Sequence, residues 1–348
     1  MPPVSAPAKV LVTGANGYVA AWVVRSLLEK GYNVRGTVRS ADKGEHLKQI
    51  FAKHGNRFEV AVVEDITKDG AFDDVVKDVD VIEHTASPFH FNAKEPDDLL
   101  VPAIHGTVGI LESVKRHGSS VKRVVITSSN AAIYTSSDKP VVFDESDWND
   151  PSVQQVEEKG VDTPPDVVYC ASKTLAEKSA WKFYNKNKAA ISWDLVVLNP
   201  PYVFGPLIQE VHSLNELNTS MQEVYDTVVL GKKDDATLQS GNAWVDVRDL
   251  GLAHVLAAEQ AAAGGKRIII SGGSFFWQEI VDVANSIKPA PVPNLAKGKP
   301  GSTIGKPYLY KFKSSSERIL GLEYRSLEST LRNALENFEE LKELKDSN

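Results

Sequence analysis

The sequence predicts an α/β protein in which a mostly parallel sheet is covered by helices on both faces. Up to Pro200, short runs rich in β-branched residues alternate strictly with segments of helical periodicity. Such alternation implies parallel strands joined by right-handed helical crossovers. Beyond Pro200 the alternation becomes irregular, which predicts a smaller C-terminal domain built over the sheet.

The elements are expected in a regular order. A buried strand at residues 9–15 precedes a helix at 20–31, and its final residue, Gly31, is typical of a helix C-terminus. The next expected strands and helices alternate: strands at 32–39, 58–65, 79–87 and 121–129, with helices at 46–55, 70–78 and 101–118. A helix containing Tyr169 and a strand at 191–205 follow a long loop.

The change of pattern sets the predicted domain boundaries. Residues 1–200 form the larger domain, and residues 241–272 look like a return to it. Residues 201–240 and 273–348 form the smaller domain, which ends in an amphipathic, charge-rich helix.

The composition is that of a soluble globular protein and limits its partners. The 348 residues carry a formal net charge of −7, which gives no basic surface for nucleic acid. We find no secretory signal and no run of about 20 apolar residues that could span a membrane. One cysteine excludes an internal disulfide, and the eight histidines lack paired ligand spacing, so we predict no metal. A cytoplasmic monomer or homodimer is expected.

The segment "VTGANGYVA" joins the first strand to the first helix. Its glycines stand where such a turn bends sharply and lets the backbone approach a pyrophosphate, while the helix N-terminus offers free N–H groups. A plain glycine turn is the alternative, but the position between strand and helix favours a Rossmann-type dinucleotide site. Cofactor contacts are therefore expected from Thr13, Gly14, Asn16, Gly17, Tyr18 and Val19.

The end of the second strand predicts which dinucleotide binds. Enzymes that use NAD usually carry Asp or Glu there for the ribose hydroxyls. The segment "TVRSADK" has no acid at the strand end, whereas Arg39 and Lys43 can pair with a 2′-phosphate. Both could instead be solvated surface cations, but their position favours NADPH.

Six motifs, "VTGANGYVA", "EDITK", "HTASP", "VVITSS", "YCASK" and "LNPPYVFGP", occur in this order. In this arrangement the chain resembles the extended short-chain dehydrogenase/reductase family. Within that family it looks like the fungal NADPH-dependent aldehyde and ketone reductases of the yeast methylglyoxal reductase type, with plant dihydroflavonol reductases more distant. The resemblance runs from about Lys9 to the C-terminus.

The resemblance implies further cofactor contacts. Asp65 and Ile66 should contact the adenine, and Thr85, Ala86 and Ser87 should line the cofactor near the nicotinamide ribose. Pro200 and Val203 should approach the nicotinamide carboxamide. Thr127 is a further polar residue expected at the cofactor, without an assigned role. The chain departs from many family members at Ala103, where they carry an asparagine that takes part in a proton relay. A water or backbone route would have to replace that asparagine here.

The segment "VVYCASKTLAEK" could be an ordinary surface helix or could carry the chemistry. Tyr169 and Lys173 are four residues apart, so they share one helical face, with Cβ atoms about 5–6 Å apart. A tyrosine with a pKa near 10 is a weak proton donor at pH 7, and a nearby ammonium should lower that pKa. The resemblance implies that Tyr169 donates the proton and that Lys173 also holds the ribose.

A hydroxyl at the end of the fifth strand should complete the catalytic set. Ser128 and Ser129 both stand there, and successive strand residues face opposite ways, so only one can point at the substrate. Alignment of the motif favours Ser129 and leaves Ser128 as the alternative.

Aromatic residues near these motifs are candidates for the substrate pocket. Phe89, Tyr134 and Tyr202 follow the "HTASP", "VVITSS" and "LNPP" motifs, and Ser129 would contact the substrate oxygen. Packing in the core is an equally good interpretation of the three aromatic residues.

These observations favour NADPH-dependent reduction of a small-molecule aldehyde or ketone to an alcohol. The cofactor would give hydride to the carbonyl carbon and the protein a proton to its oxygen. The same architecture also hosts flavonoid- and steroid-type oxidoreductases and sugar-nucleotide epimerases. A non-catalytic NADP sensor is a further alternative, although such a protein would not need the Ser, Tyr and Lys set.

Overall fold

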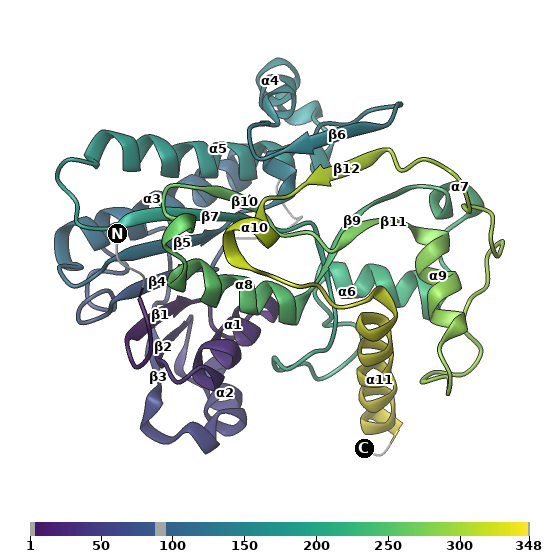
Figure 1. Cartoon of the computed structure of the whole chain (residues 1–348), viewed down its shortest axis with the longest axis horizontal. Helices are drawn as coiled ribbons and strands as arrows, with labels where there is room; N and C mark the ends of the chain where they lie inside the picture. The colour runs from purple at the N-terminus through teal and green to yellow at the C-terminus, as the bar shows by residue number, and fades with distance from the viewer. Residues whose placement is uncertain (1–3, 88–94, 347–348) are drawn as a thin grey trace.

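The structure is a computed structural model that describes residues 4–87 and 95–346. Its centre is a seven-stranded sheet in which all neighbours are parallel, in the order β10-β7-β5-β4-β1-β2-β3 (Figure 1). In chain order the strands are β1 (Lys9–Thr13), β2 (Asn33–Val38), β3 (Phe58–Val62), β4 (Val81–His84), β5 (Arg123–Thr127), β7 (Asp194–Asn199) and β10 (Arg267–Ile269). The predicted fold class is confirmed.

Two pairs of helices cover the two faces of this sheet. The helices α1 (Tyr18–Glu29) and α8 (Val247–Glu259) pack together on one face. On the other face, α3 (Asp97–His117) packs along α5 (Pro165–Asn187), as Figure 1 shows. Side chains of one strand enter both layers: Val10 and Val12 of β1 face α1, whereas Leu11 faces the α3 side. Burial on both faces explains why these strands are continuously apolar.

Two small sheets and several helices lie beside the seven-stranded sheet (Figure 1). One small sheet contains β8 (Tyr202–Phe204), β9 (Gly241–Asp246) and β11 (Gly273–Phe276), and another pairs β6 (Val141–Asp144) with β12 (Tyr310–Lys313). The remaining helices are α2 (Glu45–Ile50), α4 (Asp150–Lys159), α6 (Thr219–Val224), α7 (Asp235–Leu238), α9 (Trp277–Ser286), α10 (Ser316–Leu320) and α11 (Leu327–Asp346). Figure 1 shows α6, α9 and α11 gathered beside the β9 and β11 strands.

Three predicted elements differ from the structure. Residues 70–78 form turns instead of a helix. The strand expected at 191–205 is divided into β7 and β8, because Pro200 and Pro201 lack the N–H groups that a continuous strand would need. Within the segment expected to return to the main domain, α8 and β10 do so, but β9 pairs with β8 and β11. The division into two domains stays a prediction.

The strand order places a site at one edge of the sheet. The chain leaves β1 toward β2 on one side and occupies β4 on the other, so the direction of winding reverses between β1 and β4. In open α/β sheets, ligands bind at this point, outside the carboxyl ends of the strands.

Candidate active site

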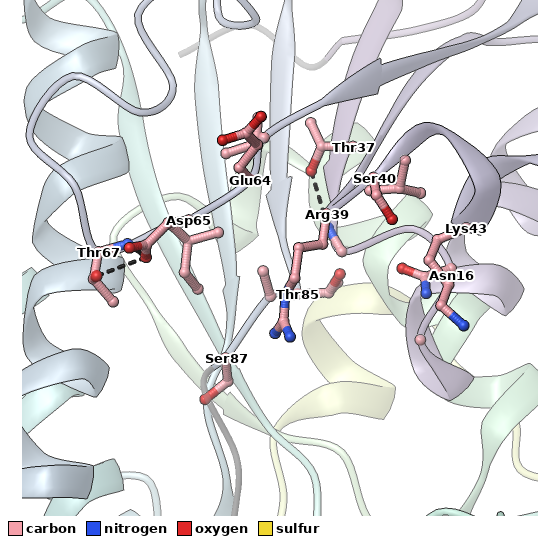
Figure 2. A pocket seen from close by; sticks show the side chains of 16 residues that line it. Asn16, Thr37, Arg39, Ser40, Lys43, Glu64, Asp65, Thr67, Thr85 and Ser87 are labelled. Carbon is pink, nitrogen blue, oxygen red and sulfur yellow. Dashed lines mark hydrogen bonds between the residues drawn. The ribbon is translucent and has the colours of Figure 1, made fainter.

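A cavity of about 710 Å³ opens at the carboxyl ends of β1, β2, β3 and β4 (Figure 2). Its walls include many of the predicted cofactor residues: Gly14, Asn16, Gly17, Arg39, Lys43, Asp65, Ile66, Thr85, Ala86 and Ser87. Segments far apart in the sequence are therefore brought together by the parallel strands. Sequence reasoning missed further lining residues, including Thr37, Ser40, Glu64 and Thr67. Their position at strand ends was the signal that could have found them.

The glycine turn fits a pyrophosphate. Gly14 has a φ of +64°, and a Cβ atom there would lie 3.2 Å from the Cα atom of Ala86. A larger residue would be strained and would crowd the end of β4. Because α1 begins at Tyr18, its first N–H groups have no partner inside the helix and can bind an anion.

Arg39 and Lys43 lie at one end of this cavity. Arg39 directly follows β2, and Lys43 belongs to a short 3-10 turn. Neither cation forms an ion pair with a described residue, in contrast to Arg35 on the same strand, whose Nε lies 2.6 Å from the Glu59 carboxylate. Figure 2 shows the Arg39 side chain reaching between the Lys43 and Asp65 sides of the cavity. Two unpaired cations at this place fit the 2′-phosphate of NADPH.

Asp65 and Ile66 line the same cavity, and Figure 2 shows Asp65 on the side of Arg39 away from Lys43. The Asp65 carboxylate accepts hydrogen bonds from the Thr67 hydroxyl at 2.6 Å and the Thr67 N–H at 2.9 Å (Figure 2). These bonds hold the pKa of Asp65 below its ordinary value. The carboxylate therefore shapes its own turn and stays ionised beside the cavity.

Other predicted cofactor residues turn their side chains away from this cavity. The hydroxyl of Tyr18 donates to the Gly205 carbonyl at 3.0 Å, and Val19 and Val203 pack in the core. Thr13 and Pro200 are buried as well. Contacts from Tyr18 and Val19 to a cofactor would therefore have to come from the backbone.

The proposed catalytic side chains meet where β5 ends beside α5. The hydroxyl of Tyr169 is hydrogen-bonded to Ser129. The ammonium of Lys173 lies 5.7 Å from the centre of the Tyr169 ring and donates to the Ser87 hydroxyl at 2.9 Å. Ser129 in turn accepts from the Ala131 N–H at 3.1 Å, which fixes its side chain. The structure thus brings Ser129, Tyr169 and Lys173 together, next to the cofactor-sized cavity.

The two serines have different partners. Ser128 donates to the Glu177 carboxylate at 2.6 Å, on the side of α5 that faces the sheet. The alternation expected from a strand therefore persists through this pair, and Ser129 is the serine that meets Tyr169. On the opposite face of β5, the Thr127 hydroxyl lies 3.0 Å from Nε2 of His254, so that its side chain is occupied there.

The electrostatics of Tyr169 differ from the expectation. Burial raises the pKa of Tyr169 to about 12, although the hydrogen bond from Ser129 opposes this. Burial also lowers the pKa of Lys173 to about 8. Both side chains keep some solvent contact, but the surrounding protein removes most of the water that would stabilise their charged forms. Tyr169 is therefore protonated at pH 7 but is a weaker acid than a free tyrosine, so the predicted lowering of its pKa by Lys173 is wrong for this structure.

Glu177 is a functional candidate that sequence reasoning missed. Its carboxylate accepts from Ser128, from Nδ2 of Asn199 at 2.7 Å and from Nε of Arg267 at 2.5 Å. Asn199 also donates to the backbone carbonyl of Ser129 at 3.0 Å. Glu177 therefore supports the strand end that carries Ser129. Its place four residues after Lys173 was the available signal.

The two described aromatic candidates, Tyr134 and Tyr202, pack against other aromatic side chains. Tyr134 lies in a cluster with Phe143, Tyr310 and Phe312, with ring centres 5.3–6.5 Å apart. Tyr202 packs against Phe275 and Trp277, with burial raising its pKa to about 12. Both tyrosines therefore have core contacts. Phe89 lies outside the described residues.

The described residues contain neither a metal-binding cluster nor a helix suited to a membrane. Within residues 4–87 and 95–346, no group of three or more His, Cys, Asp or Glu side chains is arranged to hold a metal ion. Across the same residues, none of the helices has the length and apolar character needed to traverse a lipid bilayer.

Comparison with known families decides the classification. Residues 10–272 match the model of the NAD dependent epimerase/dehydratase family. The chain belongs to this family. The match spans the glycine turn, the cavity and the helix that carries Tyr169 and Lys173.

Individual relatives cover nearly the whole chain. An NADPH-dependent methylglyoxal reductase of Saccharomyces cerevisiae is 37% identical over 92% of this chain and 95% of its own length. The ketoreductase azaE of Aspergillus niger is 38% identical over 94% and 96%. The crystal structure of yeast methylglyoxal/isovaleraldehyde reductase complexed with NADPH superposes with a TM-score of 0.83 at 34% identity, covering 97% of this chain and 99% of that one.

Proposed function

We propose that this protein is an NADPH-dependent carbonyl reductase that converts aldehydes or ketones to alcohols. The observation that carries the proposal is the meeting of Ser129, Tyr169 and Lys173 beside a cavity whose far end presents Arg39 and Lys43. The named activities of the two relatives, a methylglyoxal reductase and a ketoreductase, support it.

Different parts of the cavity would hold different parts of NADPH. The turn at Gly14 and Gly17 and the first N–H groups of α1 would bind the pyrophosphate, and Arg39 and Lys43 the 2′-phosphate. Asp65 and Ile66 would contact the adenine, and Thr85 to Ser87 would lie near the nicotinamide ribose. When bound, NADPH would supply the hydride for the carbonyl carbon.

The side chains on β5 and α5 would supply the proton and orient the substrate oxygen. Tyr169 carries a proton at pH 7, since even the ordinary pKa of tyrosine lies well above 7, and it would donate that proton to the carbonyl oxygen. Ser129, already hydrogen-bonded to Tyr169, would donate to the same oxygen. The Lys173 ammonium would favour the tyrosinate that forms as the proton leaves.

The substrate class follows from the walls that remain. Tyr202 lies close enough to Tyr169 to affect its pKa, and Tyr134 and Tyr202 are the candidate aromatic walls of a substrate pocket. We infer a small carbonyl compound, since the named relatives act on methylglyoxal and isovaleraldehyde. We also propose a cytoplasmic monomer or homodimer.

The direct test is consumption of NADPH with a panel of methylglyoxal, aromatic aldehydes, β-keto esters and dihydroflavonols, with chiral analysis of the alcohols. Turnover of at least one carbonyl class is expected. No turnover across the panel despite NADPH binding would point to a non-catalytic sensor. NAD retained through purification would point to an epimerase.

The cofactor preference has its own test in Arg39→Ala. Losing a charge-assisted contact to the 2′-phosphate should raise the KM for NADPH about 10–100-fold and leave the KM for NADH nearly unchanged. Arg35→Ala, at a paired arginine of the same strand, is the matched control. Equal use of NADH and NADPH by the wild type would contradict the assignment.

A further inference from the structure

Lys173 also lines a second, much smaller cavity. It encloses about 20 Å³ between β4, β5, α3 and α5. That volume is enough for one water molecule. Its polar and ionisable walls come from His84, Ser87, Thr107, Ser128, Lys173 and Glu177, and its apolar walls include Ala103.

His84 lines this cavity, and one of its ring nitrogens lacks a hydrogen-bond partner among the described residues. The side chain is 1% exposed, and its Nε2 atom has no hydrogen-bond partner among the described residues. The other ring nitrogen, Nδ1, lies 3.0 Å from the Thr13 hydroxyl. A buried polar atom without a partner is destabilising, so such atoms usually have one.

The hydrogen bonds of Thr13 determine which nitrogen of His84 carries the proton. The Thr13 hydroxyl oxygen accepts from the Thr85 N–H at 3.1 Å and from the Ala86 N–H at 3.0 Å. These two bonds use both of its lone pairs, so its own hydrogen must be donated to Nδ1 of His84. Burial and the nearby Lys173 ammonium lower the pKa of His84 to about 3, and the ring is neutral. Its single hydrogen therefore sits on Nε2.

The hydrogen bonds already made by Glu177, Ser128 and Lys173 determine which donors and acceptors remain for a water in the cavity. Glu177 already accepts from Ser128, Asn199, Trp181 and Arg267. Since the only hydrogen of the Ser128 hydroxyl goes to Glu177, Ser128 can offer the cavity a lone pair and nothing else. The Lys173 ammonium has three hydrogens, of which one goes to Ser87.

We propose that the small cavity binds one water molecule, which accepts hydrogen bonds from Nε2–H of His84 and from the Lys173 ammonium. The water can donate to Ser128 and to Thr107, and thereby has the two to four partners of a typical buried water. His84 is then a positioning residue that acts on Lys173 through this water. Ala103 leaves the space for the water, where an asparagine side chain would fill it.

The water has a consequence for the charge on Lys173. A hydrogen-bond acceptor beside a buried ammonium favours the charged form, so the water raises the pKa of Lys173 relative to a dry cavity. Among the described residues, the other ionisable groups near Lys173 are His84 on β4 and Tyr169 and Glu177 on α5. Within the same part of the chain, α3 contributes Ala103 and Thr107 to this wall. The inference about catalysis rests on the proposed reductase function, but the water itself does not.

The test pairs two substitutions of nearly equal shape, Ala103→Val and Ala103→Thr. Either fills the cavity, but only Thr offers an oxygen to Lys173. In Ala103→Val, the alkaline limb of the kcat profile should move down by about one pH unit, with a tenfold loss where the limb falls. Ala103→Thr should stay close to the wild type. Ala180→Val, at a buried alanine of α5 outside the cavity wall, controls for overpacking.

A crystal structure of the protein with NADP gives the independent readout. One ordered water within hydrogen-bond distance of both Nε2 of His84 and Nζ of Lys173 is expected, and it should be missing in Ala103→Val. The absence of water density at that position in the wild type, or identical pH profiles for Ala103→Val and Ala103→Thr, would overturn the proposal. If the wild type reduces no carbonyl, the proposed function fails, and the crystal structure still decides the water.

Discussion

Buried polar side chains have different kinds of hydrogen-bond partners on the two faces of the central sheet. On the α8 face, Glu83 of β4 lies 2.6 Å from Nδ1 of His254, whose Nε2 contacts Thr127 of β5. On the α5 face, His84 and Ser128, the next residues of the same strands, face a cavity and the site. In the first arrangement the protein groups bond to one another, and Oε1 of Glu83 is the one atom of the trio without a partner among the described residues. The second leaves hydrogen-bonding capacity directed at other molecules, which is what a reaction requires.

The largest expected effect concerns the α5 face, through Tyr169→Phe. Loss of the proton donor should lower kcat by a factor on the order of 10²–10⁴, while NADPH still binds. Steady-state rates and a fluorescence titration with NADPH separate the two quantities. Turnover like that of the wild type would remove Tyr169 from its proposed role.

On the α8 face, His254→Leu should change stability more than chemistry. Glu83 would lose its partner in the core, at a cost of about 3 kcal/mol at pH 7 in the free energy of unfolding. Burial raises the pKa of Glu83, so the destabilisation should shrink as the pH falls and the carboxyl takes up a proton. Urea unfolding at pH 5 and pH 7 measures both effects.

The matched control for His254→Leu replaces both partners, as Glu83→Leu with His254→Leu. Because no buried charge is then left alone, most of the lost stability should return. A double variant as unstable as the single one would show that packing, and not the ionic contact, stabilises this face.

The smallest expected effect is the pH dependence of the wild type. The pKa of Lys173 is lowered to about 8, so the ammonium is present below that pH and is lost above it. The kcat for carbonyl reduction should therefore decline as the pH rises through about 8. A flat profile between pH 7 and 10 would mean that the charge on Lys173 does not matter to the rate.

The parts of the site that could be predicted are those with short-range signals. The glycine turn, the pair Tyr169 and Lys173, and the opposite directions of Ser128 and Ser129 all follow from spacing within one element. The placement of Tyr18 was harder, because its hydroxyl reaches Gly205, 187 residues away. The rise in the pKa of Tyr169 depends on burial by the whole fold, which a lysine four residues away does not reveal.

The segment 70–78, predicted to be a helix, shows that local spacing also falls short in predicting the fold. Its apolar residues Phe72, Val75 and Val76 have helical spacing and are buried, as a helix would bury them. The chain nevertheless makes successive turns there. Spacing therefore identified the buried side but not the backbone. Thr13 and His84 are 71 residues apart in the sequence and contact each other across two strands. No local sequence pattern predicts this contact.

The short turn after β2, which would select the cofactor, would also affect the direction of the reaction. Arg39 and Lys43 stand on a surface segment that carries none of the groups that handle the proton. Substitutions there and on α5 should combine additively, since the two segments share no side-chain contact. Cells keep NADPH mostly reduced and NAD mostly oxidised, so the choice between them sets the direction in which a reversible reaction runs. Five residues, 39–43, would thus determine whether this protein removes carbonyl compounds or produces them.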